Sequence, residues 1–206
     1  MHYAMAIDIT KCIGCRACAV ACKSNNNLPN GMWWNRVVTV GGEEVDTASG
    51  TYPDDLTLGY TPISCQHCDE PPCVEVCPAE ATWKDEETGI VVIDAEKCIG
   101  CKLCIDICPY SARSFNEQVP EYPVEFALGD ADAPQHVEKV VEKCTFCANR
   151  IKRGAVPACM ELCLARCRFW GDLDDPQSEV NQYIAGKETF YLMEEKGTKP
   201  STIYVR

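Results

Sequence analysis

The segment Cys98-Ile-Gly-Cys-Lys-Leu-Cys-Ile-Asp-Ile-Cys-Pro109 determines how the rest of this sequence is interpreted. Its cysteines have the spacing C-x2-C-x2-C-x3-C-P, which is typical of segments that bind iron–sulfur clusters through thiolates. Gly100 allows the backbone to turn closely around a cluster, and Pro109 suits the first turn of a helix, where no amide donor is needed. In such a run the fourth cysteine serves a second cluster. The segment therefore predicts at least one more run in the chain.

Three further runs are present in the 206 residues, which contain 17 cysteines in all. The first run repeats the spacing unchanged, and the second lengthens its inner gap at a Pro-Pro pair. The last run has eleven residues between its second and third cysteines, and Leu164 stands where a proline is usual. The candidate ligands of the four runs are Cys12, Cys15, Cys18, Cys22, Cys65, Cys68, Cys73, Cys77, Cys98, Cys101, Cys104, Cys108, Cys144, Cys147, Cys159 and Cys163.

The first and third runs belong to an internal repeat. Residues 7–15 read IDITKCIGC and are echoed by IDAEKCIGC at residues 93–101. The alternation of apolar residues over Tyr3–Ile9 predicts a strand that leads into the first run. The repeated strand–loop–helix unit predicts a pseudo-two-fold arrangement.

Zinc and disulfides are the alternatives for so many cysteines. Disulfide frameworks do not repeat this spacing, and zinc ribbons pair two C-x2-C knuckles without the three-plus-one grouping. We therefore predict iron–sulfur clusters and a chain that is largely unfolded without them. His67 lies inside the second run, but all four cysteines are present there, so it is not predicted to be a ligand. Cys167 is predicted to be a buried thiol, with ligand exchange or a redox role as alternatives.

The chain has 31 acidic and 19 basic residues and a formal charge of −12, which argues against nucleic-acid binding. Basic side chains gather near the cysteine runs, where they favour the burial and reduction of anionic clusters. No apolar run approaches the ~20 residues of a membrane span, and the N-terminus shows no export signal. We expect a soluble chain. It has no Gly-rich phosphate loop or nucleophile–histidine pair, so it is not expected to be an enzyme by itself.

Outside the runs the sequence predicts a few short elements. Strands are expected at 34–40, 189–193 and 202–205, and a hairpin at 81–84 and 89–93. One helix is expected to end at Gly154, and another to follow the turn at 172–176 and to end at Ile184. The proline-rich, acidic stretch 111–141 is predicted to be a surface excursion.

The four runs in this order resemble those of one protein family. Supporting motifs are KCTFC at 143–147, GDLDDP at 171–176 and GTKP at 197–200. The chain resembles, from Ala4 to Val205, the four-cluster ferredoxin-like electron-transfer subunits of the dimethyl sulfoxide reductase superfamily of molybdenum and tungsten oxidoreductases. It is most similar to the small subunits of dimethyl sulfoxide, polysulfide and arsenate respiratory reductases.

The resemblance implies an α+β fold of two ferredoxin-like modules related by pseudo-two-fold symmetry, with loop and strand insertions. One module would comprise residues 1–24 and 142–170, which contain the first and fourth runs. The other would comprise residues 62–112, which contain the second and third. Residues 25–61 and 113–141 would be insertions, and residues 171–206 a C-terminal interaction segment.

The resemblance also implies how sixteen cysteines divide among four 4Fe-4S clusters, in ligand sets that we call A to D. Set A is Cys12, Cys15, Cys18 and Cys163, and set B is Cys22, Cys144, Cys147 and Cys159. Set C is Cys65, Cys68, Cys73 and Cys108, and set D is Cys77, Cys98, Cys101 and Cys104. Leu164 and the additional Cys167 depart from the family's pattern.

The function implied is electron transfer within an anaerobic reductase complex. The partner would be a molybdopterin catalytic subunit that alone holds the molybdenum or tungsten pterin, and the donor a membrane quinol-oxidising subunit or another protein. The chain would reach the cytoplasmic or periplasmic face of the cell membrane through these partners. A free polyferredoxin carrier and an iron–sulfur subunit of a formate dehydrogenase or hydrogenase complex are the alternatives. The long segments without ligands favour a docked subunit.

Overall fold

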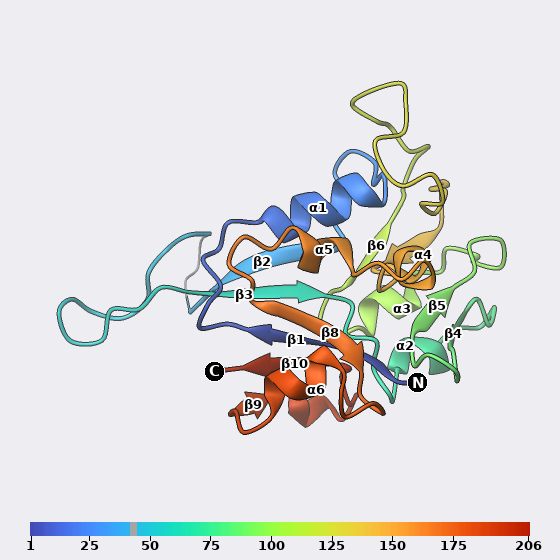
Figure 1. Cartoon of the computed structure of the whole chain (residues 1–206). Helices are drawn as coiled ribbons and strands as arrows, with labels where there is room; N and C mark the ends of the chain where they lie inside the picture. The colour runs from blue at the N-terminus through green and yellow to red at the C-terminus, as the bar shows by residue number, and fades with distance from the viewer. Residues whose placement is uncertain (42–44) are drawn as a thin grey trace.

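The centre of the computed structural model, which describes residues 1–41 and 45–206, is a four-stranded sheet (Figure 1). Its strand order is β8 (Arg168–Asp172), β1 (Tyr3–Asp8), β10 (Thr202–Val205) and β9 (Thr189–Phe190). β1 pairs antiparallel with β8 and parallel with β10, so strands from the two ends of the sequence lie side by side. The predicted strands at Tyr3–Ile9 and 202–205 are confirmed.

The central sheet packs against side chains from both halves of the chain. The buried cluster consists of Met5, Ile7, Ile90, Phe146 and Tyr204. Tyr204 is fully buried, and its hydroxyl donates to the carbonyl of Pro62 (2.8 Å). Burial of this apolar surface stabilises the contact between the sheet and the segments that carry the second, third and fourth runs.

Three antiparallel hairpins surround the sheet. They pair β2 (Asn35–Val40) with β3 (Gly59–Ser64), β4 (Thr82–Lys84) with β5 (Val91–Ile93), and β6 (Arg113–Phe115) with β7 (Val141–Lys143). The predicted strand at 34–40 and the hairpin over 81–93 are confirmed, whereas β3 was not predicted. The surface excursion over 111–141 is wrong at its ends, because Arg113 and Val141 are buried in the third hairpin.

The helices are short. They are α1 (Ala17–Asn25), α2 (Pro72–Glu75), α3 (Leu103–Asp106), α4 (Ala148–Lys152), α5 (Ala158–Glu161), α6 (Glu179–Ile184) and the 3-10 helix η1 (Glu194–Lys196). The end of α4 before Gly154 and the end of α6 at Ile184 agree with the prediction. The strand predicted at 189–193 stops at Phe190, because Met193 has a left-handed φ of 50° and leads into η1. Within the described ranges, no helix has the length and apolarity that crossing a membrane requires.

Candidate iron–sulfur centres

The two repeated loops have the same backbone shape. Gly14 and Gly100 both have left-handed φ angles, of 69° and 67°, and the residues two positions later also match, at 59° and 64°. A Cβ atom on Gly14 would lie 2.5 Å from the ring of Tyr60, and one on Gly100 would lie 2.5 Å from the carbonyl oxygen of Lys139. Both the conformation and the close approach therefore require glycine.

Set C brings together thiols from two runs. The charge of Cys68 interacts with those of Cys65, Cys73 and Cys108. Desolvation by burial raises the pKa of the Cys68 thiol to about 12, against a smaller lowering by a hydrogen bond with Thr198. Thiols held this closely in a buried place become thiolates only when a positively charged group joins them.

Set B joins α1 to the last run. The charge of Cys22, in α1, interacts with those of Cys144, Cys159 and Cys147. Burial raises the pKa of Cys22 well above its ordinary value and that of Cys147 to about 11. The side-chain amide of Asn26 donates to the Cys22 sulfur (3.6 Å). All four thiols of the set thus share one buried site.

Cys167 lies beside two of the thiols of set A. The Cys167 sulfur lies 3.5 Å from the Cys163 sulfur and forms a hydrogen bond with Cys12. This bond lowers the pKa of Cys12 and raises that of Cys167. Cys18 is buried, whereas Cys15 is exposed. The seventeenth cysteine is buried, as predicted.

Set D matches set A in exposure, because each has one exposed, one buried and two half-buried thiols. The charge of Cys104 interacts with that of Cys98, and both come from the third run. Cys101 is exposed, as Cys15 is in the first run. The Cys77 sulfur accepts the amide of Ala81 (3.3 Å) at the end of the second run.

The four sets are neighbours in one order along the molecule. Cys104 of set D interacts with Cys73 of set C. The thiols of Cys65 and Cys144 interact between sets C and B. Cys159 of set B interacts with Cys18 of set A. The order is therefore D, C, B, A, with at least one interacting pair of thiols at each junction.

The missing proline after Cys163 does not change the local backbone. The third residue after the last cysteine has a left-handed φ in three runs: 49° at Glu80, 47° at Ser111 and 47° at Arg166. In each, its amide donates to the carbonyl of that cysteine, at 3.2, 3.1 and 3.1 Å. Cys163 is held as Cys77 and Cys108 are. The next residue is alanine in two of the runs and Cys167 in the third.

The donor sets fit the group that the spacing implies. Every member is a cysteine, and soft thiolate donors in sets of four suit 4Fe-4S clusters. Burial disfavours the thiolate form of these cysteines. The positive charge of the iron in a bound cluster would stabilise the thiolates. Across residues 1–41 and 45–206, no three His, Cys, Asp or Glu side chains are grouped so as to hold a single metal ion.

The side chain of His67 forms a hydrogen bond with the backbone. Its Nδ1 accepts the amide of Val91 (3.2 Å), and the side chain is fully buried. Burial, reinforced by the charges of Lys143 and Arg113, lowers the pKa of His67 well below its usual range. The imidazole is therefore neutral. Its ring packs edge-on against Phe146, with centroids 5.1 Å apart.

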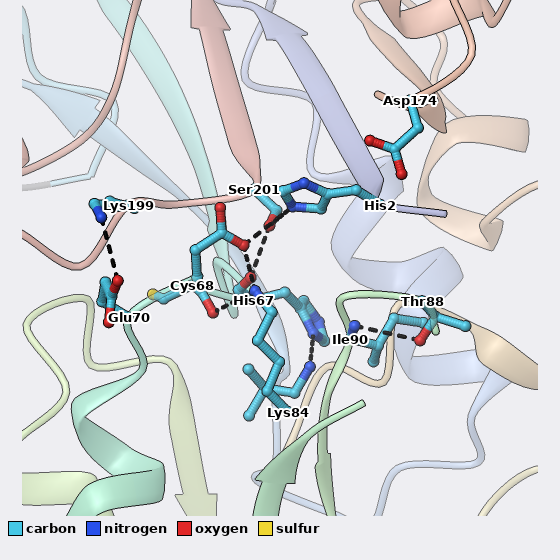
Figure 2. Close-up of polar contacts among 12 residues, drawn as sticks. His2, His67, Cys68, Glu70, Lys84, Thr88, Ile90, Asp174, Lys199 and Ser201 are labelled. Carbon is cyan, nitrogen blue, oxygen red and sulfur yellow. Dashed lines mark hydrogen bonds and ion pairs between the residues drawn. The ribbon is translucent and has the colours of Figure 1, made fainter. Parts of the chain in front are cut away.

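The stretch before β10 supports the second run (Figure 2). Ser201 Oγ donates to the carbonyl of His67 (2.7 Å) and lies 3.0 Å from His2 Nε2. Lys199 Nζ pairs with Glu70 (3.2 Å), and the amide of Glu70 donates to a carbonyl of the same stretch. The predicted interaction segment thus also contacts the loop that carries Cys68.

Three buried cations near the thiols were not identified individually from the sequence: Arg113, Lys143 and Arg168. Lys143 Nζ donates to the carbonyls of Val91 and Cys144, and its charge interacts with the thiols of sets B and C. Arg113 and Arg168 each stand five residues after the last cysteine of a run. That shared offset is the signal that could have found them.

Comparisons with known proteins agree with these centres. Residues 56–122 and 131–173 match the 4Fe-4S dicluster domain, and residues 9–31 match a 4Fe-4S binding domain. The chain is 50% identical over 210 residues to the candidate iron–sulfur subunit of dimethyl sulfoxide reductase from Halobacterium salinarum, covering 99% of this chain and 79% of that protein. The chain belongs to the dimethyl sulfoxide reductase family of iron–sulfur subunits. The resemblance noted from the sequence is confirmed.

Two other members of the family are similar over the whole chain. The arsenate respiratory reductase iron–sulfur subunit ArrB of Shewanella sp. is 36% identical, with 100% of this chain and 97% of that protein covered. A subunit of the selenate reductase of Mesobacillus selenatarsenatis is 39% identical, with 100% and 72% covered. This iron–sulfur subunit therefore binds 4Fe-4S clusters in a mixed α and β fold with ferredoxin-like domains.

Proposed function

We propose that the subunit carries four 4Fe-4S clusters in a line and relays electrons to or from a molybdopterin catalytic subunit of an anaerobic reductase. The observation that carries this proposal is the single order of the thiol sets, D, C, B, A, with interacting thiols at every junction. A line of one-electron centres is what a relay needs. The other end would face a quinol-oxidising membrane subunit or another donor.

The ligand sets that we propose are those implied by the family resemblance. Sets B and C are supported most directly, because one thiol of each interacts with the other three. For set A the support is the contact of Cys163 and Cys12 with the same Cys167. For set D it is the interaction of Cys98 with Cys104.

We also propose the two-module division. Residues 1–24 with 142–170 would form one ferredoxin-like module and residues 62–112 the other, related by a pseudo-two-fold axis. Residues 25–61 and 113–141 would be insertions, and 171–206 would combine support of the fold with contact to partners. The matching loops at Gly14 and Gly100 and the contact between His67 and Phe146, at equivalent positions of the second and fourth runs, support the symmetry.

The protein's own contribution is to hold each site and set its surroundings. When bound, the clusters supply reversible one-electron transfer with little rearrangement. Burial of Cys22, Cys147 and Cys68 limits the access of water to sets B and C, and the buried cations Arg113, Lys143 and Arg168 place positive charge beside the thiols. Cys15 and Cys101, in sets A and D, are exposed at the two ends of the order, where partners can approach.

We propose that the subunit does no substrate chemistry itself. The molybdenum or tungsten pterin, the substrate and the placement at one face of the cell membrane would all belong to its partners. The test is anaerobic co-purification from the native source, with mass spectrometry of partners and metal analysis. We expect a stoichiometric large subunit containing molybdenum or tungsten and about sixteen irons assignable to this chain. Recovery of the chain alone, iron-loaded and active with added acceptors, would favour the free polyferredoxin.

A further inference from the structure

Arg113 and Arg168 occupy equivalent places in the third and fourth runs. Each is the fifth residue after the last cysteine, Cys108 or Cys163, and each opens a strand, β6 or β8. Both are nearly inaccessible to solvent, with 6% and 2% of their surface exposed. An arginine side chain stays protonated in proteins, so each brings a permanent positive charge into the interior.

Arg113 lies between sets C and D. Its charge interacts with Cys73 of set C and with Cys104 of set D. Its charge interacts with Cys65 of set C as well. Its Nη2 donates to the neutral Thr82 hydroxyl (3.2 Å), and the like charge of Lys143 also interacts with it. The guanidinium therefore faces thiols on two sides.

Arg168 lies in the same way between sets B and A. Its Nη1 donates to the Cys159 sulfur of set B (3.6 Å), and its charge interacts with Cys18 and Cys12 of set A. Its other partners are uncharged: Nη1 also lies 3.2 Å from the Met5 sulfur, and Nη2 lies 3.3 Å from the Asn35 side-chain oxygen.

Neither guanidinium is fully satisfied by the protein. In the part of the chain that the structure describes, Arg113 Nη1 and Arg168 Nε are buried without a hydrogen-bond partner. A buried charge or donor without compensation is strongly unfavourable. The groups that face both arginines are thiols, so the counter-charge for each lies on the two ligand sets beside it.

We propose that Arg113 and Arg168 are potential-setting residues, each shared by the two clusters of one module. This inference rests on the proposed four-cluster relay. Reduction adds one negative charge to a cluster, and a fixed positive charge in a poorly polarisable interior favours the reduced form. Because each arginine lies between two sets, it raises the potentials of both neighbours together and eases transfer between them. It acts by position and forms no bond to iron.

The test uses Arg113→Gln and Arg168→Gln in the anaerobically purified complex. The readouts are iron content and EPR-monitored potentiometric titration, with signals assigned to sets through Cys→Ser variants. Arg168→Gln is expected to keep the iron and to lower the reduced-to-oxidised ratio at fixed potential by about tenfold for sets A and B, which is 59 mV for a one-electron couple. Sets C and D should not move. Arg113→Gln should show the reverse pattern.

Two controls separate charge from shape. Arg153→Gln removes a cation that is 46% exposed and already paired with Asp130 and Asp132, and it should move no potential. Arg168→Lys and Arg113→Lys keep the charge and should leave all four potentials near those of the wild type. If a Gln variant loses iron and the matching Lys variant keeps it, the result supports the inference that the positive charge at this position balances the charge of the neighbouring clusters.

Three results would overturn the inference. The first is that both Gln variants keep the full iron content and show unchanged reduction potentials. The second is that the reduction potentials of all four clusters shift by the same amount. Failure of the Lys variants to restore lost iron is the third, because it would mean that the shape of arginine is what matters. A wild-type complex with far fewer than about sixteen irons would instead contradict the four-cluster relay itself.

Discussion

The sulfur atoms of Cys163 and Cys167 lie 3.5 Å apart, and only Cys163 stands at a position that the cluster spacing requires. The equivalent of Cys167 is alanine at positions 81 and 112, in the same backbone turn. The additional thiol is thus accommodated beside the ligands of set A without a change in the turn that holds them. Its hydrogen bond to Cys12 favours the thiolate form of that ligand.

The first prediction follows from this equivalence. Cys167→Ala should keep the full iron content and change the free energy of unfolding by no more than about 1 kcal/mol, since alanine already fits this turn twice. Cys163→Ala, the matched control, should lose one cluster or convert it to a form with fewer irons. Iron analysis and EPR of both variants are the measurements. Loss of a whole cluster from Cys167→Ala would contradict the assignment of Cys163.

The second prediction tests the exchange of ligands between runs. Cys22 belongs to the first run by sequence but interacts with the thiols of the last. Cys22→Ser and Cys144→Ser should therefore alter the same EPR signal, because both would ligate the set B cluster. Cys18→Ser should alter a different one. If Cys22→Ser and Cys18→Ser changed a single common signal, the first run would hold one cluster by itself.

The third prediction concerns pH. His136 Nδ1 lies 2.7 Å from Glu142 and its Nε2 lies 2.8 Å from the carbonyl oxygen of Asn26, in the turn after α1. Burial disfavours the charged imidazole, but these hydrogen bonds outweigh burial and raise the pKa of His136. Because the pKa of His136 is higher in the folded protein than in the unfolded chain, protonation of the imidazole stabilises the fold. This stabilisation is complete at pH values below the unfolded pKa of about 6.5. This stability is lost as pH rises through the folded pKa.

Anaerobic thermal unfolding between pH 5.5 and 8 measures this effect. His136→Gln should cost about 1–3 kcal/mol at the acidic end and less at the alkaline end, so the two stability curves converge as pH rises. Asn30→Gln is the control, since its side chain is exposed and has no titratable group, and its stability curve should run parallel to that of the wild type. A difference that grows with pH would refute the protonated form of His136.

The fourth prediction concerns the support of the second run. Ser201→Ala leaves the His67 carbonyl without its 2.7 Å donor in a buried place. We expect a loss of about 1–3 kcal/mol and a faster loss of iron from set C than from the other sets. Thr51→Ala, at an exposed residue, should change neither. Equal rates of iron loss from all sets in Ser201→Ala would show that this contact does not support the second run in particular.

The fifth prediction is that removal of iron loosens the core. Cys22 packs in a buried cluster with Leu28, Met32 and Trp34. Without iron, the set B thiols remain protonated because burial raises their pKa values. The space between these thiols is then no longer occupied by a cluster. Anaerobic chelation should red-shift tryptophan fluorescence and reduce the far-UV circular dichroism. Chelation should be faster at lower pH, because protons compete with iron for the thiolates. An unchanged spectrum after complete iron loss would refute this dependence.

The cysteine spacing predicted part of the local structure around the ligands. The helix expected to begin at Pro109 is wrong, because residues 109–112 form a turn that leads into β6. The glycine conformation at Gly100 and the strand before the first run follow from short patterns that depend only on neighbouring residues. The hairpin at 81–93 has turn residues at its centre, and the helix before Gly154 has a glycine stop. Such signals are local, so the sequence carries them without knowledge of the rest of the fold.

The relations between distant segments could not be predicted in the same way. The pairs β1–β10 and β6–β7 join segments far apart in sequence, and strands of three residues are too short to show a period. The stretch 111–141 looked like surface from its prolines and acids, although its ends form a buried hairpin. Arg113 and Arg168 resembled ordinary basic residues, because burial is a property of the folded chain.

The parallel pairing of β1 with β10 has a consequence for biosynthesis. β1 precedes all sixteen proposed ligands along the chain, whereas its partner strand, residues 202–205, follows all of them. The stretch at 198–201 that supports the second run is equally late. The sheet that packs against Ile90 and Phe146 can therefore form only after the last of these cysteines has been synthesised. Until β10 pairs with β1, the thiols have to be kept reduced.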